Sequence, residues 1–232
     1  TLFPYTTLFR SIVFSQFSHM QGVDKGFNTE QLVRIPLKDK VFNKQFHAFK
    51  EELLTSPYVT QGAGAAVSFD GVATFFLDFE NLEEQAAVSI MLVENEFMEM
   101  LGVEKIEGRF FSEMQPSEYK GNYIVNESLV EMAEWENGLG QKLNNGKVGG
   151  VVKDFIYSSA KEAIAPLMIM EGGNNDYSSL FVKIEGNTKE AIRFMKGKYE
   201  EFANEYPFEF EFVDDIFAEK YRTEQMLSQV LG

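Results

Sequence analysis

The chain has no cysteine, only two histidines (His19 and His47), and 21 basic residues against 36 acidic ones. The missing cysteines exclude disulfides, thiol nucleophiles and thiolate metal sites. Neither histidine has a second histidine at metal-ligand spacing, so no zinc site is expected. The formal net charge of −15 repels phosphate backbones, and no basic stripe offsets it. We therefore expect no binding to nucleic acid.

Nucleotide-binding and catalytic motifs are also missing. The sequence contains neither a dinucleotide-binding glycine fingerprint nor a Walker A loop, and we interpret the glycines of 137–140 (NGLG) as a turn. Adjacent acidic pairs such as Glu83 and Glu84 point in different directions, so we interpret them as solvated surface rather than paired general acid and base. The sequence therefore predicts no catalytic, cofactor-binding or metal-ligating residue, and no enzyme activity. No apolar run of about 18 residues is present, so no segment is predicted to span a bilayer.

A large apolar core is nevertheless indicated, because hydrophobic residues make up 44% of the chain and 23 residues are Phe. Apolar residues recur at helical spacing in two segments, 41–54 and 188–205, which predicts an amphipathic helix in each. The stripe of the first consists of Phe42, Phe46, Phe49 and Leu53, and the stripe of the second consists of Ile192, Met195, Tyr199 and Phe202. We expect both stripes to be buried.

Each of these helices is flanked by predicted strands, 32–37 and 59–67 for the first, and 180–184 and 206–213 for the second. In the last of these, Phe208, Phe210 and Phe212 alternate with glutamates, as in a half-buried strand. Asp214 and Asp215 follow, where the N-cap and first turn of a helix favour carboxylates, and we predict that helix over 216–231. The middle of the chain holds shorter predicted elements: strands at 73–79, 86–93, 122–125, 147–153 and 167–170, and helices at 95–101 and 127–135, with Asn126 as a plausible N-cap of the second.

The predicted fold class is α+β. Two strand–helix–strand units form one mixed sheet with helices on one face, and a mainly β lobe is inserted between them. Residues 23–67 and 179–213 form the first lobe, which we expect to be membrane-proximal, and residues 68–178 form the inserted lobe.

Both ends of the chain differ from this pattern. We interpret residues 1–11 (TLFPYTTLFRS) as the translation of a sequencing adapter and exclude them from the fold. Residues 12–22 are expected to be the end of a truncated first transmembrane or stalk helix. Residues 214–232 are expected to be a stalk helix that leads to a missing second transmembrane helix. These two end helices should lie side by side.

Several motifs, taken in order, resemble the MacB-like periplasmic core domain of FtsX/MacB-type ABC transporter permeases, particularly the version found in Bacteroidetes. They are 26–28 (GFN), 97–110 (FMEMLGVEKIEGRF), 123–127 (YIVNE), 149–155 (GGVVKDF) with Pro166 and Leu167, and 206–222 with Glu224 and Gln225. Residues 137–143 (NGLGQKL) depart from the family, which usually has a proline-containing turn there.

The resemblance implies a non-catalytic periplasmic domain of an inner-membrane permease. Such a domain couples ATP-driven motion in the cytoplasm to the export or release of a substrate. The implied partners are a second permease copy in a homodimer or pseudodimer, a cytoplasmic ABC ATPase, and a periplasmic adaptor or substrate. The alternative is an extracytoplasmic ligand-sensing domain of a membrane receptor, which would contain an interior pocket with converging polar groups.

Overall fold

The computed structural model describes residues 25–38, 42–67, 69, 72–157, 164–203 and 205–231. The expectations for 1–11 and 12–22, and the position of His19, lie outside these residues. Within them, all strands belong to one sheet in the order β11-β1-β10-β2-β4-β9-β6-β8-β5, with β3 beside β4 and β7 beside β8. The fold is mixed α+β, which confirms the predicted class.

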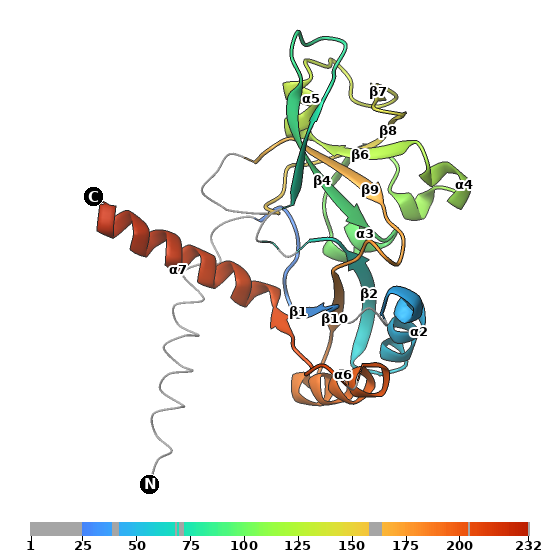
Figure 1. Cartoon of the computed structure of the whole chain (residues 1–232), viewed down its shortest axis with the longest axis vertical. Coiled ribbons are helices and arrows are strands. Elements are labelled where there is room, and N and C mark those ends of the chain that lie inside the picture. Colours follow the sequence, from blue (N-terminus) through green and yellow to red (C-terminus); the bar gives the residue numbers. More distant parts are fainter. Residues whose placement is uncertain are drawn as a thin grey trace.

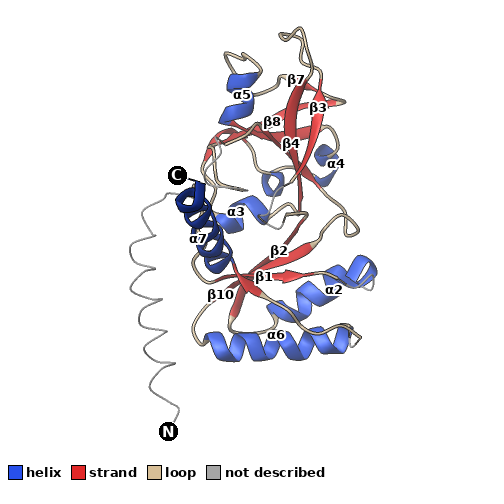
Figure 2. Ribbon diagram, turned by 60° about the vertical axis from the view of Figure 1, so that its left-hand side comes forward, coloured by secondary structure: helices blue, strands red, loops and turns tan. Residues whose placement is uncertain are grey.

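Half of the sheet forms what we call the base lobe (Figure 1). Its strands are β1 (Leu32–Pro36), β2 (Val59–Ala65), β10 (Ser179–Ile184) and β11 (Glu211–Phe212), and its helices are α2 (Phe42–Leu54) and α6 (Thr188–Phe202). All pairings among these strands are antiparallel, and the two helices cover one face (Figure 2). Phe42, Phe46, Phe49 and Tyr199 are fully buried between the helices and the sheet. Burial of each such side chain is worth roughly 1.5–3 kcal/mol, so the two predicted stripes hold the base lobe together.

The remaining strands form what we call the upper lobe. These are β3 (Ala73–Leu77), β4 (Ala86–Val93), β5 (Lys105–Gly108), β6 (Asn122–Asn126), β7 (Lys142–Leu143), β8 (Gly146–Val152) and β9 (Leu167–Glu171). The helical elements are α3 (Phe97–Leu101), the 3-10 turn η1 (Phe111–Glu113), α4 (Pro116–Tyr119) and α5 (Glu127–Met132). The parallel pairs, β4 with β9 and β6 with β8, both lie here. The sheet is therefore mixed, because the parallel pairs of the upper lobe join the antiparallel strands of the base lobe.

The last described element is α7 (Val213–Leu231), which leaves the base lobe and projects away from the body of the molecule (Figures 1 and 2). This helix begins three residues earlier than predicted. The strand before it is also shorter than predicted, since only Glu211 and Phe212 pair with β1. The predicted alternation still holds, because Phe208 and Phe210 are half-buried while Glu209 is exposed. Among the described helices, none combines the length and apolar character that crossing a membrane requires.

Candidate functional site at the joint between the lobes

The two lobes share the sheet through one narrow ladder. Between β2 and β4 only Ala65 and Val93 form a register pair. Ala66 N donates to Leu92 O at 2.8 Å, and Glu94 N donates to Gly64 O at 2.8 Å. Because this ladder supplies so few backbone bonds, the side chains on either side of it contribute strongly to the contact between the lobes.

A buried ion pair lies beside the ladder. Lys50 of α2 donates to Oε1 of Glu94, the residue that follows β4, and these residues are only 8% and 5% exposed. Gly64 N donates to the other carboxylate oxygen at 2.9 Å. His47 approaches from the solvent side, with Nδ1 3.7 Å from Glu94 Oε1 and a side chain that is 62% exposed. Loss of either partner would leave a buried charge without compensation, which is strongly destabilising.

Close packing at Gly64 adds a second constraint. A Cβ atom at this position would lie 2.6 Å from Phe46 Cζ and 2.6 Å from Tyr177 Cδ2, so no larger residue fits without displacement. The Tyr177 hydroxyl donates to Gly172 O at 2.5 Å. Burial, and after it the nearby carboxylate of Glu94, raise the pKa of Tyr177 well above its usual range. Tyr177 therefore remains a protonated donor, fixed between α2 and the turn that leads into β10.

Helix α7 is attached to this joint by an aromatic cluster. The ring of Phe217 lies 5.1 Å from Phe69 and 5.9 Å from Phe27, measured between centroids. Phe69 contacts Phe181 of β10 at 5.6 Å, and Phe27 contacts Phe155, just after β8, at 6.1 Å. The cluster therefore links α7 to a base-lobe strand and to the end of an upper-lobe strand.

Polar contacts fix the first turn of α7 in the same place. Thr29 Oγ1 donates to Asp214 Oδ1, and Lys25 Nζ lies 3.3 Å from the same oxygen. Lys25 Nζ also lies 5.8 Å from the centroid of the Phe217 ring. Asp214 and Asp215 both belong to the first turn, where carboxylates are favoured by the helix dipole. The structure thus anchors α7 to residues 25–29 through both charge and ring contacts.

The distinctive sequence 149–155 ends in a buried polar network. Asn126 is fully buried, and its Oδ1 accepts from Leu129 N (3.1 Å), the N-cap bond expected from sequence, and from Leu167 N (2.8 Å). Its Nδ2 donates to Asp154 Oδ1 at 2.7 Å. Asp154 also accepts from the backbone and the hydroxyl of Ser128. The network joins β6, α5, β8 and β9 at one point.

Gly26 rests directly on this network. Its φ of 75° is a conformation that favours glycine, and a Cβ there would lie 2.7 Å from Asp154 O. Ile156 N donates to Lys25 O at 2.8 Å. Two separate sequence motifs, 26–28 and 149–155, are therefore parts of one contact. Sequence reasoning singled out both but could not place them together.

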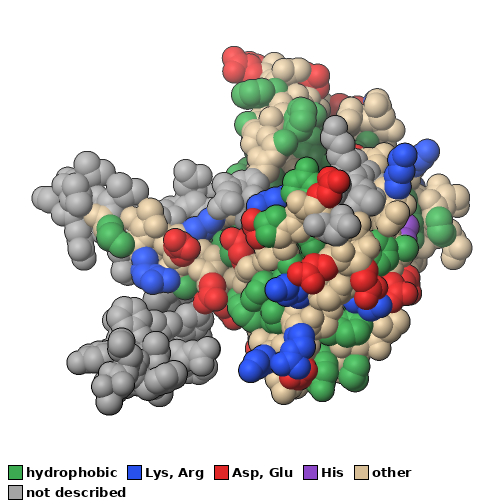
Figure 3. All heavy atoms as spheres, turned by 60° about the horizontal axis from the view of Figure 1, so that its bottom comes forward, with side chains coloured by type: hydrophobic (Ala, Val, Ile, Leu, Met, Phe, Trp, Pro, Cys, Tyr) green, Lys and Arg blue, Asp and Glu red, His purple; other side chains and the backbone are tan. Residues whose placement is uncertain are grey.

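Other features noted in the sequence lie away from the contacts between the lobes. Glu83 and Glu84 are exposed, and 137–140 form a loop in which Leu139 N donates to Glu107 Oε1. Within the described ranges, no group of three His, Cys, Asp or Glu side chains could hold a metal ion. On the face drawn in Figure 3, acidic and basic side chains are mixed. A cavity of about 360 Å³ lies against Gly26 and Asp154, at the joint itself.

Comparison with known proteins adds the fold relationship. No protein-family model matches the sequence, and no curated protein matches it. Solved structures do resemble it, and three of them are described here. The periplasmic region of MacB from Actinobacillus actinomycetemcomitans has a TM-score of 0.56 and 13% identity, over 85% of this chain and 94% of that one. A domain of a permease protein from Porphyromonas gingivalis has a TM-score of 0.55 and 17% identity, over 79% and 90%.

The third is the extracellular domain of the ABC-type transporter YknZ from Gram-positive bacteria, with a TM-score of 0.52 and 13% identity over 78% of this chain and 98% of that one. Each solved domain is thus covered almost completely. The resemblance noted in the sequence motifs is confirmed at the level of the fold. The chain has the fold of the extracytoplasmic domains of MacB-like ABC transporter permeases.

Proposed function

We propose that this chain is the extracytoplasmic domain of an ABC transporter permease and that it works as a lever. In this proposal α7 carries motion from the membrane side, and the joint passes it to both lobes. The observation that carries the proposal is the position of Phe217, which packs against Phe27 and Phe69 where the lobes meet. A displacement of α7 therefore acts directly on the contacts that hold the lobes together.

The partners that we propose are a second permease copy, a cytoplasmic ABC ATPase that supplies the energy, and a periplasmic adaptor or substrate; the similarity to permease domains supports them. In this proposal the domain sits on the periplasmic side of the inner membrane and is not itself catalytic. Its membrane-proximal part is the base lobe (23–67 and 179–213), from which α7 leaves. That residues 12–22 lie beside α7 stays a prediction. A sensor role is less well supported, because the cavity beside Gly26 is open to solvent, and two of the charged side chains that line it, Glu104 and Lys153, are mostly exposed and pair with each other at 3.2 Å.

A distance measurement in the full-length permease with its ATPase tests the lever. The chain has no native cysteine, so a spin label at Gln85→Cys, an exposed position in the loop between β3 and β4, reports the distance between two copies. A second pair of labels, at Gln85→Cys and Thr223→Cys, reports the distance within one copy. We expect ATP to change the first distance and leave the second unchanged, since the lever is rigid.

The variant Phe217→Ala should reduce the ATP-dependent change between copies and broaden the distance within each copy. The control is Met226→Ala, an exposed apolar residue on the same helix, which should behave like the parent. An unchanged distance between copies in the parent protein would refute the lever. The complete reading frame is a separate test: a histidine kinase domain in it would favour the sensor, whereas three further hydrophobic segments, or an adjacent ATPase gene, would favour the permease.

A further inference from the structure

Strand β3 forms an open edge of the sheet. Among the described residues it pairs only with β4, as the outer strand of the hairpin at the top of Figure 1. Its sequence, ATFFL, contains no charged residue and no proline. Phe75 is 51% exposed and Phe76 is 68% exposed. These two rings point to opposite faces because side chains alternate along a strand.

Natural proteins protect such edges with short strands, charges, prolines or bulges. The other described strands that have a single neighbour follow this rule. Strands β7 and β11 have two residues each and carry Lys142 and Glu211, respectively. Strand β5 carries Lys105 and Glu107 and pairs irregularly with β8. Of these four strands β3 alone is uncharged and aromatic, so within the described part of the chain its edge is available for pairing with another chain.

A hollow beside β3 would receive side chains from an added strand. It has a volume of about 480 Å³, and its lining includes the apolar residues Phe76, Leu77 and Phe79 together with the polar residues Asp78, Glu80, Lys142 and Asn144. A strand that pairs with β3 would place alternate side chains on the two faces, one of which carries the Phe76 ring. Backbone pairing supplies affinity in such complexes, and pockets for alternate side chains supply specificity.

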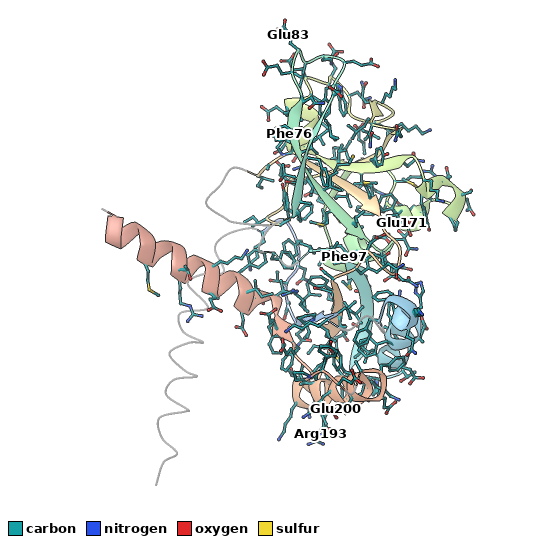
Figure 4. The ribbon with its side chains drawn as sticks, in the orientation of Figure 1. Phe76, Glu83, Phe97, Glu171, Arg193 and Glu200 are labelled. Carbon is teal, nitrogen blue, oxygen red and sulfur yellow. The ribbon has the colours of Figure 1, made fainter. Side chains whose placement is uncertain are left out.

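The charge around this edge is negative. Four exposed carboxylates follow β3 directly, at Asp78, Glu80, Glu83 and Glu84 (Figure 4 shows Glu83 at the hairpin tip). The nearest basic group, Lys142, lies 3.9 Å from Glu80, and both side chains are highly exposed, so this pair neutralises little of the field. A second copy of this chain would bring the same carboxylates to the contact, whereas a basic segment would be attracted.

We propose that β3 is the docking edge for an extended, basic segment of another protein, which joins the sheet as an additional strand. Its backbone pairs with β3, its apolar side chains contact Phe76 on one face of the sheet, and its basic side chains are attracted by the carboxylates of 78–84. This inference does not depend on the permease role, because it rests on the edge, the hollow and the charge of the hairpin.

A titration of the isotope-labelled 232-residue chain tests this proposal. The probe is a seven-residue peptide of alternating valine and lysine. We expect the amide signals of 73–77 to shift on addition, and the affinity to fall as salt rises, because exposed charges are screened. A matching valine–glutamate peptide should bind at least about tenfold more weakly, and a valine–lysine peptide with alternate backbone nitrogens methylated should not bind.

Two variants distinguish peptide binding at the edge of β3 from binding elsewhere on the surface. Phe76→Ser should weaken binding at least about tenfold, as expected for an aromatic anchor, and should melt like the parent because the ring is exposed. Ile106→Thr, an exposed apolar residue on β5, should bind like the parent. Equal binding of both charged peptides, unchanged binding by Phe76→Ser, or shifts outside 73–85 alone would overturn the proposal. Concentration-dependent dimerisation through 73–77 would also overturn it, by identifying a second copy as the occupant.

Discussion

Replacing Lys50 by methionine tests the energetic importance of the joint. Methionine keeps most of the volume of the lysine stem and removes its charge, so Glu94 keeps the bond from Gly64 N but loses its buried cation. Two charges about 4 Å apart attract by about 4 kcal/mol at the effective dielectric constant of a protein. Removing one partner of a buried pair costs about 3–5 kcal/mol, mostly because the other charge stays buried. We expect Lys50→Met to lower the free energy of unfolding by that amount.

Urea unfolding measures this loss. The single tryptophan, Trp135, packs against Phe79 in the upper lobe at 5.8 Å, so its fluorescence reports that lobe. Far-ultraviolet circular dichroism reports the whole chain, including the helices of the base lobe. In the parent protein the two transitions should coincide. In Lys50→Met they should shift to lower urea and separate, because the lobes lose a principal contact.

Two further variants complete this test. Lys196→Met removes an exposed partner of Glu200 on α6 and should cost less than about 0.5 kcal/mol. The double variant Lys50→Met with Glu94→Gln removes both charges and keeps an acceptor for Gly64 N–H. It should lose clearly less stability than the sum of its single changes. The reasoning is refuted if Lys50→Met and Lys196→Met have the same stability, or if the double variant shows simple additivity.

Four other changes have defined outcomes. Phe217→Ala should cost about 3–5 kcal/mol and speed amide hydrogen exchange throughout α7, and unchanged exchange there would contradict the anchoring role of the cluster. Gly64→Ala should lose about 1–3 kcal/mol in urea unfolding, since the new methyl group must displace Tyr177. Gly197→Ala, on an open face of α6, should instead gain about 0.5–1 kcal/mol, and a loss would show that this face is covered. Burial, and after it the nearby carboxylates, raise the pKa of Glu171. Ionisation of Glu171 therefore destabilises the folded state as the pH rises above about 4.3, the pKa of an unperturbed glutamate. Glu171→Gln should stabilise the chain at pH 7 and have no effect on its stability near pH 3, and equal effects at the two pH values would contradict this reasoning.

Periodic segments were predicted well from the sequence. The predicted positions of the stripes of α2 and α6 and of the strand β4 agree with the structure within a few residues, because the residues of a helix or strand that face the core recur at a fixed spacing. Strand β5 was missed, since Lys105 to Gly108 has no apolar alternation and pairs through an irregular register. The strand before α7 was predicted too long. Apolar and acidic side chains alternate over 208–212, but only two of these residues, Glu211 and Phe212, pair with β1.

The contacts between the lobes could not be predicted in the same way, although two features of the sequence pointed to them. Lys50 lies four residues after Phe46 on the buried side of α2, and Glu94 follows a buried strand directly. A charge at each such place suggests a partner, but the two residues are 44 positions apart in the chain. Sequence spacing alone does not show which buried charges meet.

The sequence by itself determined the local elements, the absence of cysteine chemistry, and the ordered motifs that resemble the permease domains. These depend on residue type and short-range spacing, which the chain carries directly. Only the tertiary structure decided that β2 and β4 meet at one pair, that Phe217 packs into that joint, and that β3 has no second neighbour among the described strands. Those features depend on strand order and on contacts between distant segments, and many strand orders are compatible with the same local pattern. The fold selects one of them by packing the apolar stripes of α2 and α6 against the sheet while pairing the buried charge of Glu94.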